Sequence, residues 1–524
     1  MPTVPPDDPL PSGPSPAPRI RAAGHGPPLV RRTIVADALL DAAERERLGF
    51  PTAEDQPLPV VVELNLRHRE GLTGAKRRFI EVYGRVPGER PDPELVAETY
   101  YRCQLSVEQV RALVAADMVD ADPAATAIYR IWPDFPVNPL IDQSCSTVKA
   151  DAARRSYGAG GRAITWAVID SGIDADHLHF RTHDTLGGDV ASLHRDFTVP
   201  GRPERGGALR DAFGHGTHVA GIIAGALPSP AVGPAGARQH PFDLKVVERV
   251  VDPNQPGLPR LHERKVDPSA LAGMAPECKL VSLKALDDNG GGSSMNVVRA
   301  LEYVRKELNG SGKLLRVQGV NLSVGYEFDA KWFACGQSPI CTEVDRLVRS
   351  GVVVVVAAGN TGYGSLSSFQ RQTDVGLTMT INDPGNAELA ITVGATHRDM
   401  PHTYGVSYFS SKGPTGDGRA KPDLVAPGER ITSCAAGKAL ASVSRDGPPP
   451  DPGQVAVYVE DSGTSMAAPH VSGAVAAFLS IRREFIGQPE RVKRIFLESA
   501  TSLGRERYFQ GSGLLDLMRT IQSV

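Results

Sequence analysis

Three short segments of the chain each place a reactive side chain among glycines and other small residues. Asp170 ends the apolar run that begins at Ala163, and His215 stands between two glycines. Ser465 lies in a stretch of small residues at the predicted beginning of a helix. A carboxylate, an imidazole and a hydroxyl are side chains with which proteins carry out nucleophilic acyl transfer. Taken singly, an aspartate at a strand end and a serine at a helix start are more often structural.

The three residues together are more informative than any one of them. They occur in the order Asp, His, Ser, separated by 45 and 250 residues. With the motifs GHGTHVAG (214–221) and SGTSMAAPHVSG (462–473), this order resembles the subtilisin-like serine proteases. The resemblance implies that Asp170 orients the imidazole, that His215 acts as general base and then acid, and that Ser465 is the nucleophile.

A fourth segment, VVAAGN at 355–360, ends an apolar strand with an amide side chain. Such an amide can donate a hydrogen bond to the oxygen that becomes negative in a tetrahedral intermediate. The family resemblance implies this oxyanion role for Asn360. On its own, an asparagine before Thr361 and Gly362 is equally typical of a turn.

Two further segments resemble the walls of the family's substrate groove. An extended peptide would lie between them, held by hydrogen bonds of the main chain, and side-chain choice would be left to the pockets. The residues implied in substrate binding are Ser323, Val324 and Gly325 on one wall and Gly290 and Gly291 on the other.

From about residue 150 onward, apolar strands alternate with helical segments. The predicted strands are Ala163–Ile169, Leu280–Ala285, Gly319–Val324, Val352–Ala358 and Ala390–Val393. This pattern predicts an α/β domain with a mostly parallel sheet covered by helices on both faces. In such folds the chemistry gathers at the carboxyl ends of the strands. The resemblance to the subtilisin-like catalytic domain covers residues 148–524.

The region before it, residues 57–140, predicts a small α+β module. Its predicted elements are a strand at Val60–Leu64, a helix at Gly74–Tyr83, a strand at Tyr100–Leu105, a helix at Ser106–Met118 and a strand at Ala127–Trp132. In order and position the module resembles the family's ferredoxin-like propeptide. The resemblance implies an intramolecular inhibitor that keeps the enzyme latent, with processing between Phe135 and Ala150. Residues 1–56 are expected to be a disordered, Pro-rich extension with a short helix near Ile34–Leu48.

Composition excludes several other classes of function. The formal net charge is −3 and the basic residues are scattered among acidic ones, which argues against a nucleic-acid partner. The longest apolar run, Gly351–Ala358, is far short of the roughly 20 residues that a membrane span requires. Because no apolar signal region is visible near the beginning, we expect a cytoplasmic protein, with export by an unrecognised route as the alternative. The expected partners are protein or peptide substrates and the chain's own propeptide.

The expected chemistry requires no cofactor. His215 and His218 lack the spacing and the adjacent glutamate of a zinc protease motif. Many relatives carry a calcium-ligating carboxylate nine residues beyond the catalytic aspartate, but here that position is His179, and a neutral imidazole is a poor calcium ligand. A structural calcium is therefore not favoured. The Asn309–Leu314 segment, NGSGKL, lacks two residues of a phosphate-binding loop.

Two insertions and one pair of cysteines fall outside these motifs. The Pro-rich segments Leu227–Ala270 and Ala435–Gln454 are expected to form surface loops. Cys335 and Cys341 could close a short loop by a disulfide in an oxidising compartment.

Two alternatives to a general protease stay open from the sequence: a non-catalytic binding module that keeps the groove, and a maturation enzyme with a single dedicated partner. Because the proposed base must be neutral, activity is expected to rise through about pH 6 to 8.

Overall fold

The computed structural model divides the chain into two compact units, Met1–Val137 and Asn138–Val524. The described residues are 34–35, 37–42, 45, 50–118, 122–133, 143–199, 206–228, 231–232, 238–239, 242–251, 259–329, 334–367, 372–444 and 450–524. Most of the predicted N-terminal extension and the first part of the predicted processing region, up to residue 142, lie outside them. The role of residues 57–140 as a propeptide stays a prediction at this point.

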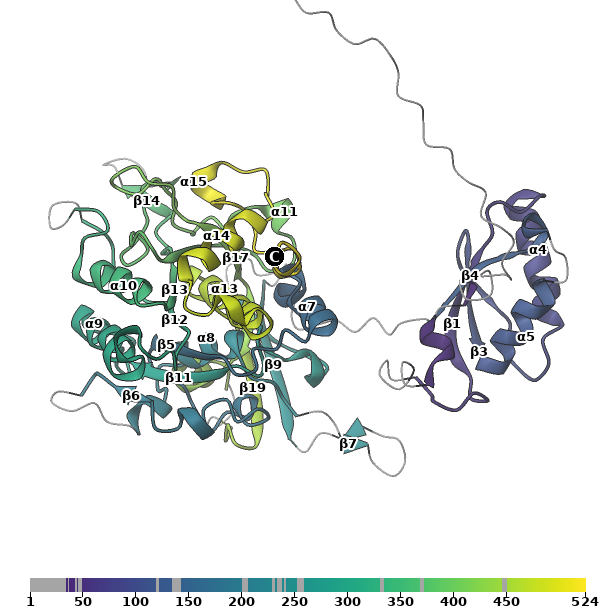
Figure 1. Cartoon of the computed structure of the whole chain (residues 1–524), viewed down its shortest axis with the longest axis horizontal. Helices are drawn as coiled ribbons and strands as arrows, with labels where there is room; N and C mark the ends of the chain where they lie inside the picture. The colour runs from purple at the N-terminus through teal and green to yellow at the C-terminus, as the bar shows by residue number, and fades with distance from the viewer. Residues whose placement is uncertain are drawn as a thin grey trace, which may run out of the picture. The chain divides into compact units, whose positions relative to one another are not determined.

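The first unit is a four-stranded sheet with two main helices (Figure 1). Its strand order is β2-β3-β1-β4. The elements are β1 (Leu58–Leu64), α4 (Gly71–Gly84), β2 (Glu94–Ala97), β3 (Tyr100–Leu105), α5 (Val107–Asp117) and β4 (Ile128–Pro133), after a short α2 (Asp37–Leu40). Every second residue of β1 is buried, as expected for a sheet with one face against helices. Helix α5 begins with a capping box between Ser106 and Gln109.

The second unit is built on a seven-stranded sheet in the order β17-β16-β13-β12-β5-β11-β6. The strands are β5 (Thr165–Asp170), β6 (Arg195–Asp196), β11 (Lys279–Lys284), β12 (Gly319–Leu322), β13 (Val353–Ala357), β16 (Ile391–His397) and β17 (Leu424–Glu429). All of their pairings are parallel, which confirms the predicted sheet.

Helices cover both faces of this sheet, as predicted (Figure 1). One face packs on α8 (His215–Ile223), α13 (Thr464–Ile481) and α14 (Pro489–Ser499), and the other on α9 (Ser294–Tyr303) and α10 (Pro339–Arg349). Strand β5 shows why both faces are apolar: Trp166 and Val168 belong to one core, whereas Ala167 and Ile169 belong to the other. A strand buried on both faces needs such a continuous apolar run.

Helix α13 runs through the middle of the larger core. Within the described ranges it is the one helix long and apolar enough to cross a membrane, with a mean hydropathy of 1.2 over 18 residues. However, 83% of that window is buried inside the unit, against strands of the main sheet and against α8. It is therefore accounted for as the core helix of a folded domain.

The first insertion does not form only loops, so that expectation was wrong. Its residues contribute β9 (Asp243–Val251) and β10 (Pro259–Arg264) to a second sheet with β18 (Ile431–Cys434) and β19 (Val455–Asp461), in the order β10-β9-β19-β18. The alternating, β-branched sequence of β9 suits a strand, but its partner β19 lies about two hundred residues further along the chain. The second insertion contains α12 (Gly437–Val443), and residues 445–449 lie outside the described part.

Candidate active site

Asp170 and His215 meet at the carboxyl end of the main sheet. Asp170 is the last residue of β5, and His215 is the first residue of α8. His215 Nδ1 lies 2.8 Å from Asp170 Oδ1, with side chains that are 19% and 1% exposed. Because the carboxylate can only accept, Nδ1 carries the proton and Nε2 is left as the basic nitrogen. The sequence predicts that Asp170 and His215, 45 positions apart, interact, and the structure contains that contact.

The electrostatic surroundings of His215 favour its protonated form. Burial alone would lower its pKa, but the charge of Asp170 and the hydrogen bond to it outweigh burial and raise the pKa to about 9. The charges of Asp461 and Asp211 act in the same direction. This imidazole is thus a stronger base than a free histidine.

Close packing between the helix and the strand end requires a small residue after His215. A Cβ on Gly216 would overlap the carbonyl of Gly172 and touch the side chain of Asp170. The glycine in this motif is what allows the first turn of α8 to lie directly on the loop that follows β5.

Ser465 is the second residue of α13, which packs against α8 in the same core. Its hydroxyl donates to the carbonyl of Ser323 at 3.1 Å, and the hydroxyl of Ser323 donates to the carbonyl of Ser465 at 2.8 Å. Among the described residues, no hydrogen bond joins Ser465 to His215. Hydrogen bonds of this kind are often long in an enzyme without substrate and shorten in the complex.

Asn360 follows β13 and lies beside the residue that precedes Ser465. Its Oδ1 accepts hydrogen bonds from the backbone N–H of Thr464 at 2.9 Å and from the Thr464 hydroxyl at 3.0 Å. Since both contacts are donors, they fix the orientation of the amide and turn its own N–H groups away from Thr464. Asn360 is exposed, so these N–H groups are available to an incoming group.

The residues predicted to bind substrate lie on either side of these groups. Ser323, Val324 and Gly325 follow β12, and Ser323 contacts Ser465 as described. On the other side, Gly290 has a φ of +82°, and a Cβ there would lie 2.5 Å from the ring of Phe213. Gly291 donates to Asp287 Oδ1 at 3.0 Å and so belongs to the same tight turn.

Phe213 connects this second wall to the histidine. Its ring centroid lies 6.4 Å from that of His215. The glycine-rich turn is therefore on the imidazole side of the site, whereas Ser323 is on the hydroxyl side.

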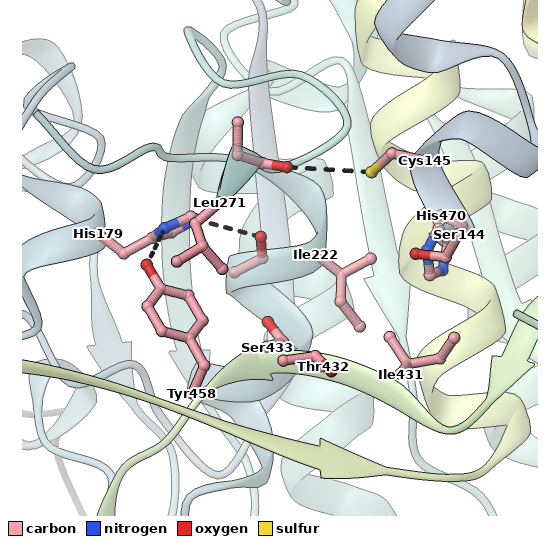
Figure 2. Close-up of a pocket in the computed structure, with 12 residues that line it drawn as sticks. Ser144, Cys145, His179, Ile222, Leu271, Ile431, Thr432, Ser433, Tyr458 and His470 are labelled. Atoms are coloured by element: carbon pink, nitrogen blue, oxygen red, sulfur yellow. Dashed lines mark hydrogen bonds between the residues drawn. The ribbon is translucent and has the colours of Figure 1, made fainter. Parts of the chain in front are cut away.

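His179 stands at the position where the family resemblance implied a calcium ligand, and each of its ring nitrogens makes a hydrogen bond (Figure 2). His179 Nε2–H donates to the carbonyl of Gly221 at 3.3 Å, and Nδ1 accepts from the hydroxyl of Tyr458 at 2.8 Å. Burial lowers the pKa of His179 to about 3, so the ring is neutral. Calcium prefers several oxygen ligands, and these residues do not fit it. Within the described residues, no group of three or more His, Cys, Asp or Glu side chains is arranged to hold a metal ion.

All six cysteines are free thiols. Cys341 is buried in α10, which raises the pKa of its thiol, and Cys335 Sγ lies 3.9 Å from the Arg419 guanidinium. The disulfide considered from the sequence is not formed in this structure.

Comparison with known proteins agrees with this architecture. Residues 161–513 match the model of the subtilase family. The chain belongs to the subtilase family. It is 28% identical to subtilisin E of Bacillus subtilis (strain 168) over 378 residues, which cover 72% of this chain and 70% of that protein. It is 26% identical to the serine protease AprX of the same organism over 383 residues, which cover 70% of this chain and 68% of that protein.

A third relative is the intracellular serine protease of Paenibacillus polymyxa, 28% identical over 364 residues that cover 68% of this chain and 80% of that protein. The subtilase is accordingly a serine endopeptidase, a hydrolase that acts on proteins or peptides and needs no cofactor for catalysis.

Sequence reasoning missed two polar residues of this subtilase that hold the site together. Thr464 orients the amide of Asn360, and Asp211 accepts hydrogen bonds from the first turn of α8. Thr464 lies inside the serine motif and could have been singled out as the direct neighbour of Ser465. Asp211 stands four residues before His215, outside the glycine-rich motif, and nothing in the local pattern marks it.

Proposed function

We propose that this subtilase cleaves extended polypeptides through Asp170, His215 and Ser465. As Ser465 Oγ bonds to the scissile carbonyl carbon, His215 Nε2 takes the hydroxyl proton. The carbon–nitrogen bond then breaks, and His215 returns that proton to the leaving amine. Water hydrolyses the resulting acyl-enzyme by the same steps, which regenerates Ser465. The observation that supports this assignment most is the hydrogen bond between Asp170 and His215, made by groups at the ends of β5 and α8.

Oxyanion stabilisation is proposed to come from Asn360 Nδ2 together with the backbone N–H of Ser465. The support is the pair of hydrogen bonds from Thr464 that turn the Asn360 amide donors outward. An Asn360→Ala variant is expected to lose about 10²–10³ in kcat, a range measured in subtilisin, with little change in KM. Steady-state kinetics on a peptide substrate checks this. An equal loss in an Asp176→Asn control would contradict it, since Asp176 is exposed and follows β5, whereas Asn360 follows β13.

The substrate chain is proposed to lie between the two walls, with Ser323–Gly325 on one side and Gly290–Gly291 on the other. The first wall is anchored at its end, because Tyr326 and Asp383 exchange two backbone hydrogen bonds of 2.9 and 3.0 Å. A segment fixed in this way could pair through its main chain with an extended peptide.

Latency is proposed to come from the N-terminal module, residues 57–140. The module has its own apolar core, and its sheet also carries exposed apolar side chains at Val96, Tyr100 and Tyr129. Association with another surface would remove this apolar area from water. The catalytic unit of the same chain is the partner that we propose.

The decisive experiment compares the wild-type protein with Ser465→Ala. A fluorophosphonate probe should label only the wild type, at Ser465, and mass spectrometry should find the wild-type chain cut between Phe135 and Ala150 while the variant stays intact. A variant that is processed and cleaves peptides as fast as the wild type would refute the assignment. Digestion of a mixed proteome then separates a broad protease from one with a single dedicated substrate.

A further inference from the structure

A second buried carboxylate, Asp211, lies directly beside the Asp170–His215 pair. It is 5% exposed and accepts four hydrogen bonds, two on each oxygen. Oδ1 accepts from the Ser171 hydroxyl at 2.9 Å and from the Gly214 N–H at 2.7 Å. Oδ2 accepts from the N–H and the hydroxyl of Thr217, at 2.8 and 2.7 Å.

These donors come from the ends of the two elements that carry Asp170 and His215. Ser171 immediately follows Asp170, and its N–H also donates to Asp170 Oδ1 at 2.7 Å. Gly214 and Thr217 flank His215 in the first turn of α8. The Ser171 hydroxyl in turn accepts from the N–H of Gly216 at 2.9 Å. One carboxylate therefore ties the end of β5 to the beginning of α8.

The beginning of α8 has a physical need for this carboxylate. The first N–H groups of a helix have no partner within it, and the residue at the N-cap, Gly214, has no side chain with which to supply one. Asp211 supplies the missing acceptor, and its negative charge lies at the positive end of the helix. Burial raises the pKa of Asp211 and the charge of Asp170 acts in the same direction, whereas the hydrogen bonds from Gly214 and Thr217 lower it.

We propose that Asp211 is a positioning residue of the active site, which holds His215 and Asp170 in register by joining the helix to the strand end. The inference rests on the proposed function, because it assigns a role toward that function's base and its orienting carboxylate. Asp211 touches neither substrate nor the reacting atoms, and acts through the backbone of Gly214 and the side chains of Ser171 and Thr217.

Asp211 also contributes charge to the surroundings of His215. The groups that face this imidazole are Asp170 after β5, Asp461 at the end of β19, Asp211 before α8, His218 within α8 and Lys438 of α12, which lies over the neighbouring Phe213 ring. The three carboxylates all raise the pKa of His215. Removing the charge of Asp211 should therefore make His215 a weaker base, an effect that a purely structural residue would not produce.

The test uses the full-length protein and follows kcat, KM and the rate of fluorophosphonate labelling across pH. Asp211→Asn keeps the size of the side chain but loses the charge and two acceptor sites. We expect kcat to fall about tenfold, or about 10²-fold in Asp211→Ala, with KM nearly unchanged. In Asp211→Asn the rising limb of the pH profile should move toward lower pH. Asp176→Asn, which removes the charge of an exposed aspartate nearby, should match the wild type.

Wild-type rates and an unmoved pH limb in Asp211→Asn would overturn the inference. If that variant fails to fold, Thr217→Val decides, since it keeps the charge of Asp211 and removes one of its donors, together with the acceptor of the Asp174 N–H. Slower labelling with an unmoved limb supports the role, and unchanged labelling contradicts it. A wild-type protein that has been cut between Phe135 and Ala150 and is still not labelled would contradict the proposed function itself, which separates the two failures.

Discussion

Two histidines of the catalytic unit, His215 and His179, have opposite properties. His215 is next to the carboxylate of Asp170, and its pKa is raised to about 9. His179 is buried between a tyrosine hydroxyl and a backbone carbonyl, and its pKa is lowered to about 3. Both rings lose water on folding, so burial does not distinguish them. The neighbouring charge makes one a base and leaves the other a neutral packing element.

The largest expected effect separates the two histidines by function. His215→Ala should lower kcat by about 10⁶-fold, by analogy with the corresponding change in subtilisin. His179→Phe should leave kcat within a factor of a few, because the ring lies among Tyr458 and Gly221 rather than beside Ser465. Active-site titration followed by kinetics measures both. A comparable loss of kcat in the two variants would erase the distinction.

The second prediction concerns the charge of Asp170, which raises the pKa of His215. Asp170→Asn keeps the shape of the side chain but no longer requires the proton on Nδ1, and kcat should fall by about 10⁴-fold. The rising limb of its pH profile should also move toward the value of free imidazole, about 6.5. Stopped-flow or progress-curve assays between pH 5 and 10 test this. An unchanged midpoint would mean that Asp170 is not the source of the raised pKa.

The third prediction concerns stability at His179. In His179→Phe the Tyr458 hydroxyl and the Gly221 carbonyl lose their partner while buried, which should cost about 2–4 kcal/mol. Thermal unfolding of Ser465→Ala protein, which cannot digest itself under the proposed function, measures this loss. Tyr458→Phe is the matched control and should cost less, because it leaves His179 with one bond.

Because the site does not fit calcium, neither calcium nor a chelator should change the melting temperature through these residues. A calcium-dependent shift in melting temperature that is abolished in His179→Phe would contradict this interpretation.

The fourth prediction concerns the pH dependence of stability. The pKa of His179 and His177 is lowered by burial to about 3 and about 4, below the unfolded value of 6.5, so the unfolded chain binds more protons in that window. Stability should fall as pH drops below 6.5, by about 1.4 kcal/mol per pH unit for each ring. The raised pKa of His215 has the opposite sign: its contribution is complete below 6.5 and is lost as pH rises toward 9. Denaturant unfolding of Ser465→Ala between pH 4 and 9 measures both slopes.

Activity follows the same pKa of His215 in a different way. The sequence alone suggested a rise through about pH 6 to 8, near the value of an ordinary imidazole. The charge of Asp170 moves the expected midpoint above 6.5. A profile that is already flat at pH 6.5 would show that substrate or solvent offsets this charge.

The residues of the site differ in how far they could be predicted. Asp170, His215, Ser465 and Asn360 each lie at the end of an apolar element among small residues, because the substrate and the backbone must approach them closely. That local requirement makes the segments stand out in a single sequence, whereas the proposed roles of the four residues came from the resemblance to the subtilisin-like motifs. The main parallel strands were visible for a related reason, since burial on both faces demands continuous Val and Ile.

Features that depend on distant partners could not be predicted in this way. The acceptor role of Asp211 exists only when Ser171 and Thr217 converge on it, and the partner of His179, Tyr458, is 279 residues away. The hairpin β9–β10 has ordinary strand composition, yet it becomes a sheet only beside β19. Sequence patterns indicate what a residue needs from its neighbours in the chain, whereas these contacts form only in the tertiary structure.

The second sheet has a consequence for attempts to shorten this enzyme. Its strand β19 pairs with the inserted β9 along one edge, and only three residues lie between its end at Asp461 and Ser465. Deleting β9 and β10 would leave the main-chain N–H and C=O groups on that edge of β19 without partners. An exposed strand edge of this kind can pair with other chains and cause aggregation. A variant shortened in this way is therefore expected to aggregate through the part of the chain that immediately precedes Ser465.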